Sequence, residues 1–249
     1  SRNNRCGMLI GQGVPVEEAP RAVERISGKE NTGRHSSLTE LTELLPYELT
    51  GAQKRAINDI YHDTVLKRVD GITPAMSRIL VGDVGCGKTV CAAAAIYIAF
   101  KSGYQSALMV PTEILAIQHY NDLSDLLGRL GVRVELLTGS LTPTKKRAIH
   151  ERLALGEIDL VIGTHAIISE KVDFARLGLI VTDEQHRFGV KQRGVLKSKT
   201  QSAHMLVMSA TPIPRSLALA LYGDLDISRI DEMPKGRNRV DTYVVDEEY

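Results

Sequence analysis

Short runs of aliphatic residues alternate along the chain with longer stretches that mix apolar and polar positions. The runs are four to six residues long and largely hydrophobic, which is typical of strands buried on both faces. Such strands occur in parallel sheets because the crossover helices cover both sides. The pattern predicts an α/β fold with a mostly parallel sheet and helices on both faces. The predicted strands are residues 78–81, 107–110, 132–137, 160–163, 177–182 and 205–209.

Two of the intervening stretches carry clear helix signals. Thr142 and Pro143 suit the start of a helix and Gly156 its end, so residues 143–155 are predicted to be helical. Thr50 begins another predicted helix, because apolar residues follow it at helical spacing. Those residues are Ala56, Ile57, Ile60, Tyr61 and Val65.

Composition limits the class of protein. Of 249 residues, 43% are hydrophobic and 24% are charged, as in a globular domain with a substantial core. The longest apolar stretch, residues 90–100, is too short to cross a bilayer, and no secretory signal is visible. Cys6, Cys86 and Cys91 lack the spacing of metal ligands, and their odd number argues against a disulfide framework. We therefore expect a cytoplasmic protein with reduced thiols and no membrane attachment.

Residues 82–89 read GDVGCGKT and stand between a predicted strand and an alanine-rich stretch. A strand, a glycine-rich loop and a helix in this order form a phosphate-binding loop, whose backbone N–H groups surround phosphate oxygens. Lys88 is expected to reach the terminal phosphates, and the Thr89 hydroxyl is expected to bind Mg²⁺. The predicted nucleotide-binding residues are Gly82, Asp83, Val84, Gly85, Cys86, Gly87, Lys88 and Thr89.

A second signal, DEQH at residues 183–186, follows a later predicted strand. Asp183 is a candidate Mg²⁺ ligand, and Glu184 is a candidate for orienting or deprotonating the attacking water, as phosphoryl transfer requires. Gln185 and His186 are candidates for sensing the γ-phosphate. Ligands of parallel sheets gather at the carboxyl ends of the strands, so both motifs are expected at one edge. The predicted catalytic residues are Lys88, Asp183 and Glu184.

Gln53 has two interpretations that the residues themselves leave open. With Thr50 it fits a capping box, in which both side chains satisfy free N–H groups at a helix start. Alternatively, its amide recognises the edge of an adenine base, because an amide donates and accepts at once.

Seven motifs, in order along the chain, resemble those of the first motor lobe of superfamily-two DNA helicases. The extended DEQHRFGV and ATPIPR strings are most similar to the RecG family, the branched-DNA helicases of bacteria. The resemblance covers residues 38–249. The motifs are LTGAQ (49–53), GDVGCGKT (82–89), PTEILAIQH (111–119), TGS (138–140), GTHAI (163–167), DEQHRFGVKQR (183–193) and SATPIPRSLAL (209–219).

The resemblance implies a RecA-like P-loop NTPase lobe that uses ATP and Mg²⁺ and acts on branched or forked DNA in recombination and repair. It implies that Gln53 contacts adenine, and that Ser209, Ala210 and Thr211 couple hydrolysis to movement. Because the formal net charge is only +1, DNA contacts must come from local groups. The resemblance assigns these contacts to Pro111, Thr112, Thr138, Gly139, Gly163, Thr164 and His165.

The same resemblance divides the chain. Residues 1–37 are expected to be the remnant of a preceding domain or linker, 38–234 the helicase ATP-binding domain, and 235–249 the start of a connection to a second motor lobe. That lobe, with its arginine finger, and a wedge domain are expected in the full-length protein, which we expect to be monomeric. An arginine finger contributes ~10³ to 10⁵ in rate. The chain alone is therefore expected to bind ATP weakly and to hydrolyse it near background.

Two alternative functions compete with this interpretation. A transcription-repair coupling translocase has similar motifs, but its acidic motif usually reads DEEH, so Gln185 favours the RecG family. A nucleotide-binding or DNA-binding module without turnover is the second alternative. The presence of Lys88, Thr89, Asp183 and Glu184 argues against it, because each has the group that hydrolysis demands.

Cys86 departs from the family pattern, which more usually has serine at this position. The cysteine side chain is small enough to fit the loop. We expect an exposed thiol beside the phosphates, open to oxidation.

Overall fold

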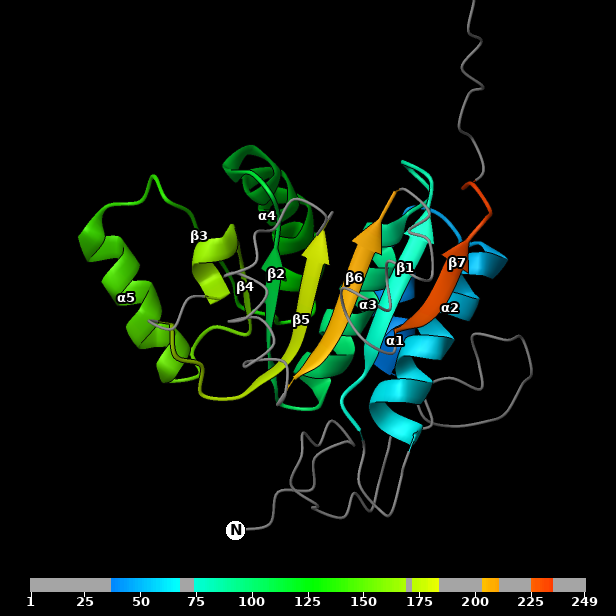
Figure 1. Ribbon diagram of the computed structural model, residues 1–249, viewed down its shortest axis with the longest axis horizontal. Helices are drawn as coiled ribbons and strands as arrows, with labels where there is room; N and C mark the ends of the chain where they lie inside the picture. Colours follow the sequence, from blue (N-terminus) through cyan, green and yellow to red (C-terminus); the bar gives the residue numbers. More distant parts are fainter. Residues whose placement is uncertain (1–36, 68–73, 169–171, 184–202, 211–224, 235–249) are drawn as a thin grey trace, which may run out of the picture.

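The structure, a computed structural model, describes residues 37–67, 74–168, 172–183, 203–210 and 225–234. Its strands form one seven-stranded sheet in the order β3-β4-β2-β5-β6-β1-β7 (Figure 1). Every strand pair is parallel, so all carboxyl ends lie at the same edge. The strands are β1 (Ser77–Gly82), β2 (Gln105–Met109), β3 (Val134–Leu137), β4 (Leu160–Gly163), β5 (Leu177–Asp183), β6 (His204–Ser209) and β7 (Asp226–Ile230).

Helices cover both faces of this sheet. Side chains from α1 to α4 share one buried cluster with Leu80, whereas Ile149 and Leu153 of α5 share a second cluster with Ile79, on the other face. Figure 1 shows α1 to α4 grouped behind the sheet. The helices are α1 (Ser37–Glu43), α2 (Gly51–Tyr61), α3 (Lys88–Lys101), α4 (Glu113–Gly128) and α5 (Pro143–Ala154), with a π-helical turn η1 (His62–Leu66) and a 3-10 turn η2 (His165–Ile168).

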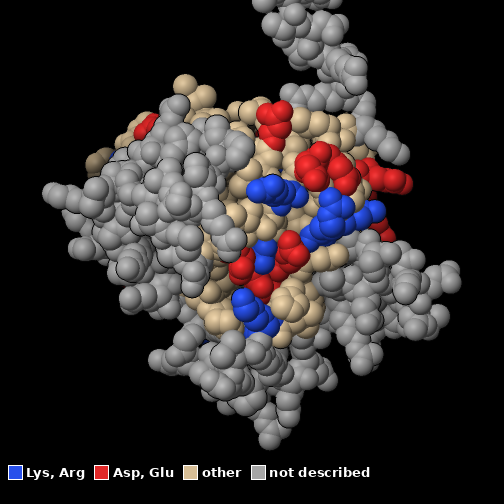
Figure 2. Space-filling view, turned by 45° about the vertical axis from the view of Figure 1, so that its right-hand side comes forward, with Lys and Arg blue, Asp and Glu red and all other residues tan. Residues whose placement is uncertain are grey.

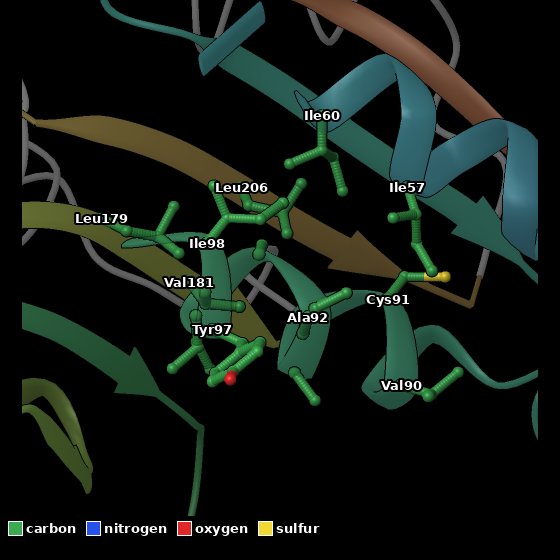
Figure 3. Packing of buried hydrophobic residues seen from close by; sticks show 14 of the residues in the cluster. Ile57, Ile60, Val90, Cys91, Ala92, Tyr97, Ile98, Leu179, Val181 and Leu206 are labelled. Carbon is green, nitrogen blue, oxygen red and sulfur yellow. The ribbon is translucent and has the colours of Figure 1, made fainter. Parts of the chain in front are cut away.

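Helix α3 is the centre of the larger cluster. Ten of its fourteen residues are buried, so it is apolar on nearly all sides, as in a helix enclosed by its domain. The alanines at 92–95 let the neighbouring elements approach closely. Figure 3 shows Ile57 and Ile60 of α2, and Leu179 and Leu206 of the sheet, packed around α3. This packing fixes α3, and with it the loop that precedes it.

A buried ion pair joins β1 to η1, and its hydrogen bonds extend to β7 and α2. Arg78 is 8% exposed and donates from Nε and Nη2 to Asp63 Oδ2, at 3.0 and 2.6 Å. Its Nη1 donates to Ser228 Oγ at 2.7 Å, and that hydroxyl donates to Asp59 Oδ2 at 2.6 Å. Because the buried charges are paired and hydrogen-bonded, the cost of removing them from water is offset.

Acidic and basic side chains lie next to one another on the side of the molecule that carries α2 and β7 (Figure 2). Arg55 pairs with Asp231 at 3.3 Å and with Glu232 at 3.2 Å, and Lys67 pairs with Asp226 at 3.7 Å. The described part of this face therefore offers no broad positive field to a nucleic acid.

The predicted fold class is confirmed, and all six predicted strands are present with ends shifted by at most two residues. Asp183 is the last residue of β5 instead of lying beyond it. The helix predicted at 143–155 is Pro143–Ala154. Strand β7 was not predicted. The expected domain boundaries stay predictions, since residues 1–36 and 235–249 lie outside the described residues.

Buried His204 predicts a loss of stability in mild acid. Its Nδ1 accepts the Met76 N–H at 2.8 Å, and burial lowers its pKa from 6.5 to about 4. The folded imidazole stays neutral at pH values where the unfolded one binds a proton. The stability that it contributes is therefore complete above pH 6.5 and is lost as the pH falls from 6.5 towards 4.

His204→Asn keeps an acceptor near Met76 but cannot titrate. Between pH 7 and pH 4, the free energy of unfolding of the unmodified chain should fall by up to about 3 kcal/mol more than that of this variant. Urea unfolding followed by circular dichroism measures both. Equal pH dependences would contradict the assignment of this titration to His204.

Candidate functional site

The carboxyl edge of the sheet carries the described residues of the phosphate loop, Asp183 and the predicted DNA segments. Neighbouring strands β1, β6 and β5 end at Gly82, Ser209 and Asp183. Gly82 and Asp183 are thus separated by one strand, β6, which corresponds to about 10 Å. Farther along the same edge are β2, β4 and β3, which carry the predicted DNA residues. The two predicted sites therefore occupy opposite halves of one edge.

The phosphate loop has glycine where no side chain fits. Gly85 and Gly87 have φ of 81° and 85°, in the left-handed region that favours glycine. A Cβ on Gly87 would lie 2.1 Å from Gln53 Nε2, and one on Gly82 would lie 2.5 Å from Cys86 Sγ. Gly87 is also the N-cap of α3 and has no side chain to cap that helix. The first N–H groups of α3 are therefore left for an anion.

Lys88, the first residue of α3, folds back onto the loop. Its Nζ donates to the Gly82 carbonyl at 2.8 Å and to the Asp83 carbonyl at 3.0 Å. The Asp83 carboxylate accepts the Val84 N–H at 2.7 Å, which holds the exposed turn of the loop. The ammonium thus adds positive charge next to the free N–H groups.

Gln53 links α2 to the phosphate loop. Its Oε1 accepts the Thr50 N–H at 2.9 Å, and its own N–H donates to Thr50 Oγ1 at 3.2 Å, so the capping box is present. Its Nε2 donates to the Cys86 carbonyl at 2.9 Å, and the side chain is fully buried. The structural interpretation of Gln53 is therefore confirmed, whereas its contact with adenine stays a prediction.

Cys86 is buried, so the expected exposed and oxidisable thiol is wrong. The residue is 1% exposed because its side chain packs against Gly82 in the interior. Burial raises the pKa of the Cys86 thiol, and burial likewise raises the pKa of Cys91 to about 12. Both are free thiols that stay protonated near neutral pH, which makes them poor nucleophiles.

Asp183 has a partner that the sequence did not predict. His119 of α4 places Nε2 3.3 Å from Asp183 Oδ2, and the two side chains are 11% and 17% exposed. His119 lies within the PTEILAIQH motif, but helical spacing indicates only that it shares the buried face of α4. A contact between residues 64 positions apart depends on the strand order, which no local pattern gives.

The first two predicted DNA segments contact each other through α4. Thr112 is the N-cap of α4, and its hydroxyl accepts the Leu115 N–H. Glu113 Oε1 accepts the Ser140 N–H at 3.1 Å, and a Cβ on Gly139 would lie 2.7 Å from the same oxygen. Thr138 is buried and bonds to the Ser140 hydroxyl, whereas Pro111 is only half-buried.

Close packing of β4 against β3 explains the glycine at position 163. A Cβ on Gly163 would lie 2.0 Å from the Leu137 carbonyl oxygen of β3. Thr164 is buried, and His165 begins the turn η2. On the other half of the edge, Ser209 is buried at the end of β6, with Ala210 half-buried beside it.

Several predicted site residues lie outside the described residues, namely Glu184, Gln185, His186 and Thr211. Among the described residues, no group of three or more His, Cys, Asp and Glu side chains is arranged to hold a metal ion. None of the described helices is long and apolar enough to cross a membrane.

Gly87→Ala should weaken the binding of an ATP analogue by roughly tenfold or more, since left-handed strain of about 1–2 kcal/mol adds to the collision with Gln53. Gly131→Ala is the matched control, because Gly131 has φ of 82° but nothing within 4 Å of its Cβ position. Titration with a fluorescent analogue measures binding, and thermal unfolding reports the strain in both. Equal affinities in the two variants would show that the close approach of Gln53 to Gly87 is unimportant.

Known proteins with similar sequences point to one family. Residues 50–219 match the model of the DEAD/DEAH box helicases. The chain is 51% identical over 212 residues to the ATP-dependent DNA helicase RecG of Synechocystis sp., covering 85% of this chain and 25% of that protein. It is 52% identical over 206 residues to the RecG of Thermotoga maritima, covering 83% and 26%. The chain thus spans about a quarter of the length of these curated relatives.

Solved structures agree with the sequence matches. The structure of RecG bound to a three-way DNA junction has a TM-score of 0.69 and 48% identity, covering 82% of this chain and 26% of that one. A DEAD box protein from Methanococcus jannaschii, at 18% identity and a TM-score of 0.55, shares the fold and covers 81% of this chain and 55% of its own. Because the family match extends over more than half of its residues, the chain belongs to the DEAD/DEAH box helicase family.

Proposed function

We propose that this chain is the ATP-binding motor lobe of a DNA helicase that acts on branched DNA in recombination and repair. The observation that carries the proposal is the shared carboxyl edge, where the uncapped start of α3 lies one strand away from Asp183. Family membership and about 50% identity to RecG helicases support it. In the full-length protein, ATP is hydrolysed to ADP and phosphate.

The phosphate loop fits a triphosphate. Its glycines remove side chains that would fill the loop, and the N–H groups at the start of α3 face the anion together with Lys88. Gln53 donates a hydrogen bond to the same loop, and in the proposed complex its side-chain amide also contacts the adenine base. Its amide still has one hydrogen and one lone pair beyond those used in the capping box and the loop contact.

The donor atoms at this edge also fit Mg²⁺. The Thr89 hydroxyl and the Asp183 carboxylate provide oxygen ligands, which this ion prefers. Mg²⁺ is usually held by one or two carboxylates, substrate phosphates and water instead of a cage of protein ligands. When bound, the ion supplies positive charge that offsets charge on the phosphate oxygens.

Different residues of the chain have different proposed roles in hydrolysis. The N–H groups of α3 and the Lys88 ammonium orient the triphosphate and stabilise the negative charge of the transition state. Glu184, which follows Asp183, is proposed to orient the attacking water in line with the γ-phosphate and to accept its proton. Gln185 and His186 are proposed to sense the γ-phosphate. The strand between the two motifs, β6, ends at Ser209. Ser209, Ala210 and Thr211 are proposed to couple hydrolysis to movement.

The other half of the edge is proposed to bind the DNA backbone. Threonine hydroxyls and backbone N–H groups are typical phosphate contacts and need no strongly positive surface. The three segments follow neighbouring strands, which supports one continuous track. A relative at 48% identity is bound to a three-way DNA junction, and identity to RecG favours this function over a transcription-repair coupling translocase. The proposed residues are Pro111, Thr112, Thr138, Gly139, Gly163, Thr164 and His165.

The full-length protein is proposed to contain further domains beside this lobe. The curated relatives extend far beyond the matched region, which supports a second motor lobe and a wedge domain in the full-length protein. We propose that residues 38–234 form the ATP-binding domain, with 1–37 and 235–249 connecting it to its neighbours. The full-length protein is proposed to act as a monomer in the cytoplasm, where Cys86 and Cys91 stay reduced.

Lys88→Ala should weaken the binding of Mg²⁺ and an ATP analogue by roughly 10- to 100-fold, because it removes a hydrogen bond from a charged group to a phosphate, worth about 1.5–3 kcal/mol. Lys101→Ala is the matched control, since Lys101 ends the same helix and its Nζ lies 3.4 Å from Glu40. Isothermal titration calorimetry measures both. Retained affinity in Lys88→Ala would count against the phosphate site.

The DNA part of the proposal is tested by hydrolysis in the full-length protein. A forked duplex should raise the steady-state ATPase rate more than a linear duplex of the same length and composition. A Thr164→Val variant should lose several-fold of that stimulation while keeping its affinity for ATP, since a lost phosphate hydrogen bond is worth roughly 1 kcal/mol. Hydrolysis at the background rate both with and without DNA would favour a binding module without turnover.

A further inference from the structure

The contact between His119 and Asp183 joins two motifs that the proposed function treats separately. His119 belongs to the segment after β2, on the DNA half of the edge, whereas Asp183 ends β5, on the nucleotide half. The imidazole Nε2 lies 3.3 Å from the carboxylate Oδ2. A carboxylate can only accept, so the contact assigns the ring proton to Nε2.

Packing alone does not explain this histidine. His119 shares the buried face of α4 with Ala116, Leu123 and Leu127, and only 9% of its surface is exposed. Its Nδ1 is buried without a hydrogen-bond partner among the described residues. An unpaired buried nitrogen costs free energy, and an apolar side chain would fill the same space without that cost. Within the described part of the chain, the hydrogen-bond contact of the ring is the one with Asp183.

Helix α4 is well placed to hold the imidazole still. Its first turn is capped by Thr112 and bonded through Glu113 to Ser140. Glu113 and His119 are six residues apart, or about 9 Å along a helix. The helix is therefore fixed near its start and along its buried face, so that the ring position is set before any ligand arrives.

We propose that His119 is a positioning residue for Asp183. By donating from Nε2 to Oδ2, it fixes the rotation of the carboxylate and leaves Oδ1 free for the metal ion. The inference rests on the proposed function, because it takes Asp183 as a Mg²⁺ ligand. Hydrogen bonds to ligating carboxylates orient the ligand, and their loss typically lowers metal affinity 10- to 100-fold. His119 itself touches neither substrate nor metal in this arrangement.

Two amide replacements separate positioning from packing. His119→Gln places an amide N–H near the position of Nε2, whereas His119→Asn places one near Nδ1 and cannot reach Asp183. The experiment measures the affinity of a fluorescent ATP analogue at increasing Mg²⁺ concentrations, with the chain and both variants. His119→Asn should raise the half-saturating Mg²⁺ concentration roughly 10- to 100-fold. His119→Gln should restore it to near the original value, and neither variant should change affinity in the presence of EDTA.

Other outcomes separate the failure of this inference from that of the proposed function. If both variants had the same half-saturating Mg²⁺ concentration, the inference would be overturned, whether or not that concentration differed from that of the unmodified chain. Thermal unfolding midpoints of the two variants would show whether packing was lost. Binding of the analogue that does not respond to Mg²⁺ in the unmodified chain would overturn the inference but leave nucleotide binding standing. No binding of the analogue by the unmodified, folded chain would overturn the proposed function itself.

Discussion

The rest of the site depends on the free N–H groups at the start of α3. Burial of ten residues fixes the helix, and the glycines of the preceding loop keep side chains away from its end. Gln53 adds a hydrogen bond from α2 to the Cys86 carbonyl, so the loop is held from both sides. Donors that are oriented before a ligand arrives need little reorganisation, which is what makes them effective against developing charge. The fold thus builds the phosphate site as part of its core.

Strand order determines which groups can act together. Because β6 lies between β1 and β5, the Ser209 segment stands between the phosphate loop and Asp183. The half of the edge that is proposed to bind DNA begins on the next strand, β2, and α4 follows directly from it. His119 of that helix contacts Asp183, which lies on the other half of the edge. The proposed ATP and DNA sites thus share one edge, and α4 gives them a short physical connection.

The sequence predicted what depends on local patterns. Continuous aliphatic runs gave six strands, and the spacing of Thr50 and Gln53 gave the capping box. It missed β7, because this edge strand mixes polar and apolar residues without a regular period, and its buried Ser228 is held by a hydrogen bond from Arg78. It also missed the His119 contact and the burial of Cys86. Both depend on which side chains the tertiary fold brings together.

A crystal structure of the chain with ADP and Mn²⁺ in place of Mg²⁺ tests the central claim most directly. The β-phosphate should lie within about 2.7–3.2 Å of the N–H groups at the start of α3. An anomalous Mn²⁺ peak should lie beside Thr89, on the side of Asp183. A nucleotide bound elsewhere, or an ion distant from both residues, would contradict the central claim.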